Sequence, residues 1–143
     1  MNNVYVVVKN LVILKEYKIM NNLIICVDFD GTCVTHEYPN IGKEIGATEV
    51  LKQLTDMGHN IILFTMRSDK ELQDSVNWFE ERNIPLFGIN ENPEQHTWTQ
   101  SPKPYAHLYI DDAALGCPIK YDPTLSDRVF VNWEIIKNLL NLT

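Results

Sequence analysis

Four short runs of mainly apolar residues are the feature that most restricts how this chain can fold. They span residues 23–27, 61–64, 85–89 and 107–110, and the first reads Leu-Ile-Ile-Cys-Val, with no polar residue. A run of this length without alternation is typical of a strand buried on both faces, as in a parallel sheet. We therefore expect the four runs to be strands of one parallel sheet.

Three helices and one more short strand are predicted around these runs. The helices span about 45–57, 69–82 and 133–140, and the short strand spans 129–131. The second helix starts after Ser68, which is followed three residues later by Glu71, as in a capping box. Strands that alternate with helices predict an α/β fold with a layered, mostly parallel sheet.

The chain has the length of a single domain. Its 143 residues are 45% hydrophobic, which is enough for a substantial core. Residues 20–22 repeat the Met-Asn-Asn of residues 1–3, and the first predicted strand begins directly afterwards. We therefore assign residues 20–143 to one domain and interpret residues 1–19 as an N-terminal extension or an added edge strand.

Charge excludes one class of partner. Twelve Lys and Arg against nineteen Asp and Glu give a net charge of −7. Non-specific binding to nucleic acid depends on clustered basic residues that neutralise phosphates, so we expect none here.

The remaining composition predicts a soluble cytoplasmic protein without a membrane partner. The most apolar stretch, residues 4–14, is interrupted by Lys9 and Asn10 and is shorter than the roughly 20 residues of a membrane-spanning helix. The three cysteines form no CxxC pair, and unpaired thiols are typical of a reducing compartment.

Acidic residues follow two of the predicted strands. Asp28 and Asp30 come after the first strand, and Asp111 and Asp112 follow the strand at 107–110. Ligands bind beyond the carboxyl ends of the strands in sheets of this kind, so these carboxylates should meet at one edge. Such a cluster needs a counter-charge, and oxygen ligands of this type suit Mg²⁺, which we predict as the cofactor.

Three further residues are candidates for binding a phosphate at this edge. Thr65 follows the second strand and offers a hydroxyl, and Lys103 offers a mobile positive charge. Arg67 leaves the same strand end as Thr65, and it is either a substrate contact or a solvated charge.

Taken together, these residues resemble the four motifs of the haloacid dehalogenase-like (HAD) superfamily. Residues 28–32 read Asp-Phe-Asp-Gly-Thr, like the first motif, and residues 62–65 resemble the second, a hydrophobic strand that ends in Thr or Ser. Lys103 lies where the Lys of the third motif would fall, and residues 109–112 resemble the fourth. The resemblance covers residues 22–116.

This resemblance implies a Rossmann-like fold and a two-step phosphoryl transfer through an aspartyl-phosphate. Asp28 would be the nucleophile, and Asp30 would protonate the leaving group and then activate water. Asp28, the backbone carbonyl of Asp30 and Asp111 would hold Mg²⁺, with Asp112 beside them. Thr65 and Lys103 would bind the transferring phosphate.

The intervals between the motifs leave no room for a folded cap domain. We therefore expect a small, capless HAD-like phosphatase, in which the loop of residues 90–104, with Trp98, and the segment around Tyr38 cover the site. Its substrate would be a phosphorylated small molecule or the phosphorylated end of a nucleic acid. Two alternatives stay open: transfer of the phosphate to an acceptor other than water, and a catalytically idle HAD-like binding module.

Overall fold

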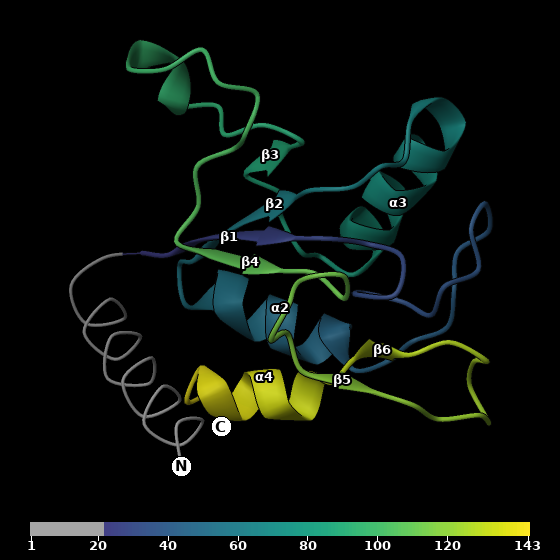
Figure 1. The fold of residues 1–143 in the computed structure, drawn as a ribbon. Helices are drawn as coiled ribbons and strands as arrows, with labels where there is room; N and C mark the ends of the chain where they lie inside the picture. The colour runs from purple at the N-terminus through teal and green to yellow at the C-terminus, as the bar shows by residue number, and fades with distance from the viewer. Residues whose placement is uncertain (1–21) are drawn as a thin grey trace.

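A parallel sheet of four strands organises the computed structural model, which describes residues 22–143 (Figure 1). The strands are β1 (Ile24–Val27), β2 (Asn60–Leu63), β3 (Gly88–Ile89) and β4 (Leu108–Ile110), in the order β3-β2-β1-β4. Each of the four predicted runs thus contributes a strand, and the chain has the expected α/β, Rossmann-like fold. The predicted extension, residues 1–19, lies outside the described residues.

The register of the sheet brings the candidate residues to one edge. Val27 of β1 is level with Leu63 of β2 on one side and with Ile110 of β4 on the other. All three strands are parallel, so their carboxyl ends coincide, and the residues that follow them share that edge.

The helices lie where their apolar spacing predicts. They are α2 (Ala47–Asp56), α3 (Asp69–Glu81) and α4 (Trp133–Leu139). Gly58, at φ +91°, follows α2 in a conformation that other residues rarely adopt. Ser68 is the N-cap of α3 as predicted, although its side chain forms no capping hydrogen bond, whereas the side chain of Asn132 accepts one from Ile135 N–H.

The core lies between one face of the sheet and the helices. Its largest fully buried side chains include Phe29, directly after the nucleophile candidate, and Phe79 of α3. Phe29 packs edge-on against Trp78 with ring centroids 5.6 Å apart and is tilted against Phe79 at 6.2 Å. Burial of an aromatic side chain contributes on the order of 2–3 kcal/mol, so this cluster fixes the turn that follows β1.

A small antiparallel sheet, which the sequence only half predicted, lies beside the main one. It pairs β5 (Ile119–Lys120) with β6 (Phe130–Val131), and only the second strand was expected. Val131 N–H donates to the carbonyl of Gly31, and the indole N–H of Trp133 donates to the carbonyl of Thr32 at 2.6 Å. The end of the chain therefore braces the turn after β1.

The connection from β3 to β4 does not cover the carboxyl edge, contrary to expectation. It includes a short 3-10 helix, η1 (Gln95–Thr97), and it rises as a lobe on the side where β1 and β4 begin (Figure 1). Trp98 packs on Tyr105 at 5.9 Å, and Tyr105 packs on His107, which directly precedes β4. Asp111 lies four positions after His107, with the three residues of β4 between them, a span of about 13 Å along the strand.

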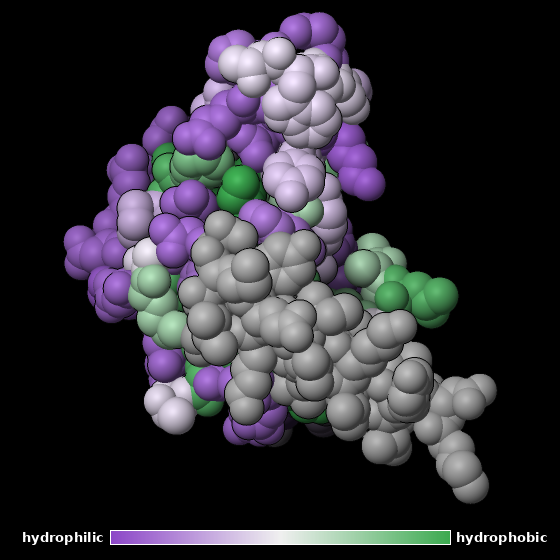
Figure 2. All heavy atoms as spheres, turned by 90° about the vertical axis from the view of Figure 1, so that its left-hand side faces the viewer, coloured by the Kyte–Doolittle hydropathy of each residue, from purple (hydrophilic) through white to green (hydrophobic). Residues whose placement is uncertain are grey.

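Side-chain amides hold this lobe in shape. Gln95, only 8% exposed, donates to the carbonyls of Ser101 and Lys103 and accepts Tyr105 N–H. In the view toward this side the lobe stands at the top, and the described surface is mostly hydrophilic or near neutral with isolated hydrophobic projections (Figure 2). Within residues 22–143, no helix combines the length and apolar character that crossing a membrane requires.

Candidate active site

The turn after β1 depends on one glycine. Gly31 has φ +77°, and a Cβ there would lie 2.6 Å from Asp112 Oδ2. Phe29 accepts three backbone hydrogen bonds at its carbonyl, from the N–H groups of Thr32, Cys33 and Val34. The turn thus curls tightly around Phe29 and lets the segment after β4 approach the backbone.

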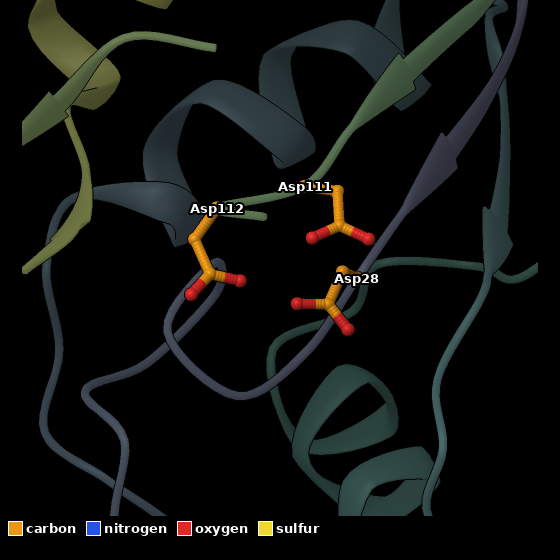
Figure 3. A group of neighbouring side chains, drawn as sticks. All are labelled: Asp28, Asp111 and Asp112. Atoms are coloured by element: carbon orange, nitrogen blue, oxygen red, sulfur yellow. The ribbon is translucent and has the colours of Figure 1, made fainter. Parts of the chain in front are cut away.

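Three of the four predicted carboxylates meet at the carboxyl edge. Asp28 comes from β1, and Asp111 and Asp112 come from the end of β4; one oxygen of each lies within 4.8 Å of the others. Figure 3 shows the carboxylates of Asp28 and Asp111 facing each other, with Asp112 alongside. Within residues 22–143, no Lys, Arg or His forms an ion pair with any of the three.

A buried hydroxyl links the two halves of this cluster. The Thr32 hydroxyl, fully buried, donates to Asp28 Oδ2 at 2.8 Å, lies 3.3 Å from Asp112 Oδ1 and accepts the Asp112 N–H at 3.1 Å. Thr32 therefore fixes the orientation of Asp28 relative to the loop after β4.

The electrostatics of the cluster favour a proton or a cation on Asp28. Burial, the charge of Asp111 and the contact with Asp112 together raise the pKa of Asp28 from 3.8 to about 8, and burial contributes most. The hydrogen bond from Thr32 acts in the opposite direction. A divalent cation would replace that proton, and three carboxylates with exposed neighbouring space match the oxygen ligands of Mg²⁺.

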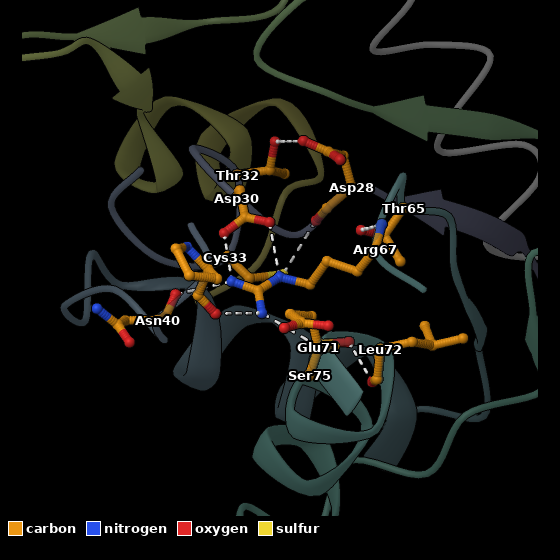
Figure 4. A network of polar contacts seen from close by, with 11 residues as sticks. Asp28, Asp30, Thr32, Cys33, Asn40, Thr65, Arg67, Glu71, Leu72 and Ser75 are labelled. Carbon is orange, nitrogen blue, oxygen red and sulfur yellow. Dashed lines mark hydrogen bonds and ion pairs between the residues drawn. The ribbon is translucent and has the colours of Figure 1, made fainter. Parts of the chain in front are cut away.

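Asp30, the fourth predicted carboxylate, points elsewhere. Its two oxygens accept Arg67 Nε–H and Arg67 Nη2–H, each at 2.7 Å, so its side chain is not part of the acidic cluster (Figure 4). The sequence interpretation gave Asp30 a metal bond through its backbone carbonyl, and that role stays a prediction.

Arg67 is neither a substrate contact nor a solvated charge, the two interpretations that its sequence position allowed. It is only 3% exposed, and all five of its N–H groups donate to protein oxygens: the two of Asp30 and the carbonyls of Pro39, Asn40 and Glu71. No donor remains for a phosphate. The predicted substrate contact is therefore corrected to a buried contact between loops, because three neighbouring carbonyls and one carboxylate surround the guanidinium.

Thr65 and Lys103 have separate contacts, and in the part of the chain that the structure describes, no hydrogen bond or ion pair joins either side chain to the acidic cluster. Thr65, half-buried after β2, accepts Arg67 N–H at its hydroxyl (3.2 Å) and donates its own backbone N–H to Asn90 Oδ1 (2.8 Å). Lys103 is exposed, and its ammonium lies 5.3 Å from the ring centroid of Tyr109. Within residues 22–143 this ammonium makes no ion pair, so it is available to an anion near β4.

Sequence reasoning missed three residues that shape this site. The sequence interpretation included Thr32 only as part of the first motif, placed Asn90 at the start of a loop and gave His36 no role at the site. A Cβ on Gly31 would meet His36 Cδ2 at 3.0 Å, on the same point that Asp112 approaches. Asn90, at φ +54°, was detectable because Asn tolerates this conformation directly after a strand.

The chain is similar to one solved structure, a conserved protein from Bacteroides thetaiotaomicron. The two share 36% sequence identity over 85% of this chain and 91% of the other, with a TM-score of 0.68. This chain therefore belongs to the same family as that conserved protein. No protein-family model and no curated protein matches the chain.

Proposed function

We propose that this protein is a Mg²⁺-dependent phosphohydrolase of the HAD superfamily that works without a cap domain. One observation carries the proposal: three carboxylates from two adjacent strand ends converge within 4.8 Å without a basic partner among the described residues. Such a group holds a divalent cation and leaves coordination positions for a phosphate.

Each residue has a chemical role in this proposal. Asp28 attacks phosphorus and becomes the aspartyl-phosphate as the bond to the ester oxygen breaks. Mg²⁺ held by Asp28, Asp111 and Asp112 would supply the positive charge that brings the two anions together. Thr65 and Lys103 bind the phosphate, and the N–H groups of the turn after β1 assist them. Asp30 protonates the leaving group and then deprotonates the attacking water.

The substrate in this proposal is a phosphate monoester on a small molecule or at a nucleic-acid end. The three free cysteines, Cys26, Cys33 and Cys117, agree with a cytoplasmic setting.

A screen of phosphate esters tests the proposal. The purified protein is incubated with p-nitrophenyl phosphate, nucleotides, sugar phosphates and 3′-phosphorylated oligonucleotides, with Mg²⁺ or with EDTA, and inorganic phosphate is measured. We expect phosphate release that needs Mg²⁺ and that Asp28→Asn abolishes. Mg²⁺ binding without phosphate release from any ester would favour an idle binding module, and phosphate that appears on an added alcohol instead would favour a phosphotransferase.

A further inference from the structure

Arg67 joins three segments that the chain brings to the site from different directions. Its guanidinium contacts the turn after β1 through Asp30, the flap of residues 36–44 through the carbonyls of Pro39 (3.1 Å) and Asn40 (2.8 Å), and the first turn of α3 through the carbonyl of Glu71 (3.2 Å). Its own backbone N–H donates to Thr65. Figure 4 shows these contacts converging on one side chain.

The geometry of the Arg67–Asp30 pair leaves little freedom to Asp30. The guanidinium and the carboxylate form two parallel hydrogen bonds of 2.7 Å, the fork arrangement that fixes both position and plane. The guanidinium is itself held between two rings, 5.0 Å from the centroid of Phe29 and 5.2 Å from that of Tyr38. Each carboxylate oxygen keeps one lone-pair direction that Arg67 does not use.

We propose that Arg67 is a positioning residue for the proposed phosphohydrolase: it holds the Asp30 carboxylate at a fixed orientation toward the leaving-group side of the site and fixes the flap by the same guanidinium. This inference rests on the proposed function and assigns a role that the sequence motifs do not include. Arg67 touches neither the acidic cluster nor the phosphate. Its loss should therefore affect proton transfer to the leaving group and leave metal binding intact.

The leaving group separates this role from a purely structural one. An alkyl phosphate needs a proton on its departing oxygen, whereas p-nitrophenolate departs with little help, so a misplaced proton donor slows the first far more than the second. A variant that only loosens the fold would slow both substrates by the same factor.

The experiment compares kcat/KM for an alkyl phosphate and for p-nitrophenyl phosphate in the full chain, with saturating Mg²⁺. This constant covers the steps up to departure of the leaving group and excludes hydrolysis of the shared aspartyl-phosphate, in which Asp30 also acts. Arg67→Met removes every donor, and Arg67→Lys keeps the charge but cannot form the fork. We expect kcat/KM to fall by about 100-fold or more for the alkyl ester and by about tenfold or less for the aryl ester. The Mg²⁺ concentration for half-maximal activity should change less than about threefold, because Arg67 contacts none of Asp28, Asp111 and Asp112. If Arg67→Met does not fold, as judged by circular dichroism, Arg67→Lys carries the comparison.

Two further variants complete the design. Arg82→Met is the matched control, since Arg82 also lies over an aromatic ring, Trp78 (4.2 Å), and pairs with a carboxylate, Glu44 (2.7 Å) at the end of the flap, but contacts neither Asp30 nor the acidic cluster. It should leave the ratio of the two rates unchanged. In an Asp30→Asn background, Arg67→Met should not change that ratio further, because Arg67 acts through Asp30.

The outcomes separate this inference from the proposed function. Equal losses on both substrates, or an alkyl-specific loss that persists in the Asp30→Asn background, would overturn the positioning role while the phosphohydrolase stands. A wild-type chain that hydrolyses neither ester would reject the proposed function and this inference with it.

Discussion

The affinity for Mg²⁺ should depend steeply on pH, because binding must remove a proton from Asp28. Burial and the neighbouring carboxylates raise the pKa of Asp28 to about 8 in the metal-free chain. At pH 6, roughly 1% of the Asp28 side chains would then be ionised, since the ionised fraction falls about tenfold per pH unit below the pKa. The apparent dissociation constant for Mg²⁺ should therefore be about 100-fold larger at pH 6 than well above pH 8, a difference of about 2.7 kcal/mol.

Isothermal titration calorimetry at pH 6, 7 and 8 measures this directly. Titrations in two buffers with different ionisation enthalpies give the number of protons released, which should be close to one per Mg²⁺ at pH 6. Asp28→Asn cannot release that proton, so its weaker binding should vary little with pH. An affinity that is flat from pH 6 to 8 would refute the proton–metal exchange at Asp28, and so would an Asp28→Asn variant that still releases one proton.

The same carboxyl links stability to pH when the metal is removed. The folded-state pKa of Asp28, about 8, lies above the ordinary value of 3.8, so the folded chain keeps a proton that the unfolded chain loses. This contribution to stability is fully present below about pH 4 and is lost as pH rises toward 8. In EDTA, the Asp28 contribution to the free energy of unfolding should therefore decrease over this range, and the difference between wild type and Asp28→Asn in urea titrations isolates it.

Three other predictions test single contacts. Asp28→Asn should lower turnover of any substrate at least 1000-fold, roughly the loss expected when a nucleophile is removed. Its melting temperature without metal should stay equal to that of the wild type or rise. Retention of a tenth of the wild-type rate would contradict the role of Asp28 as nucleophile. Trp133→Phe should lower the free energy of unfolding by about 1–3 kcal/mol in urea, because the carbonyl of Thr32 loses its buried donor; Trp78→Phe, which loses no hydrogen bond to the site turn, is the comparison. Trp98→Ala should change kcat/KM for any substrate less than about twofold, because Trp98 packs at the amino end of β4; a substrate-specific loss of tenfold would restore the predicted cover.

Sequence patterns predicted the elements whose signals are local. The run at residues 23–27 is short and apolar throughout, which favours a strand buried on both faces, and it became β1. The last helix was predicted to start at residue 133, and it does, directly after its N-cap Asn132. The convergence of Asp28, Asp111 and Asp112 also followed, because the carboxyl ends of parallel strands must share an edge.

Features that depend on where a side chain finds partners were beyond the sequence. Arg67 occupies a chain position from which it can reach solvent or the interior, and only the fold shows that four oxygen-bearing residues surround it. The lobe around Trp98 was misplaced for a similar reason. This connection leaves β3 at the carboxyl edge of the sheet and must return to the opposite edge, where β4 begins. Its length alone does not reveal near which of the two edges it projects.

The hydrogen bond from Trp133 to Thr32 has a consequence for how the protein is made. The two residues are 101 positions apart in the sequence. During translation, the Asp-Phe-Asp-Gly-Thr segment is therefore made well before Trp133, whose indole supports it. Until then, the emerging chain holds Asp28 on a turn without this support, and Asp111 and Asp112 also arrive late. A nascent chain interrupted before residue 133 would therefore lack the hydrogen bond that supports the turn next to Asp28.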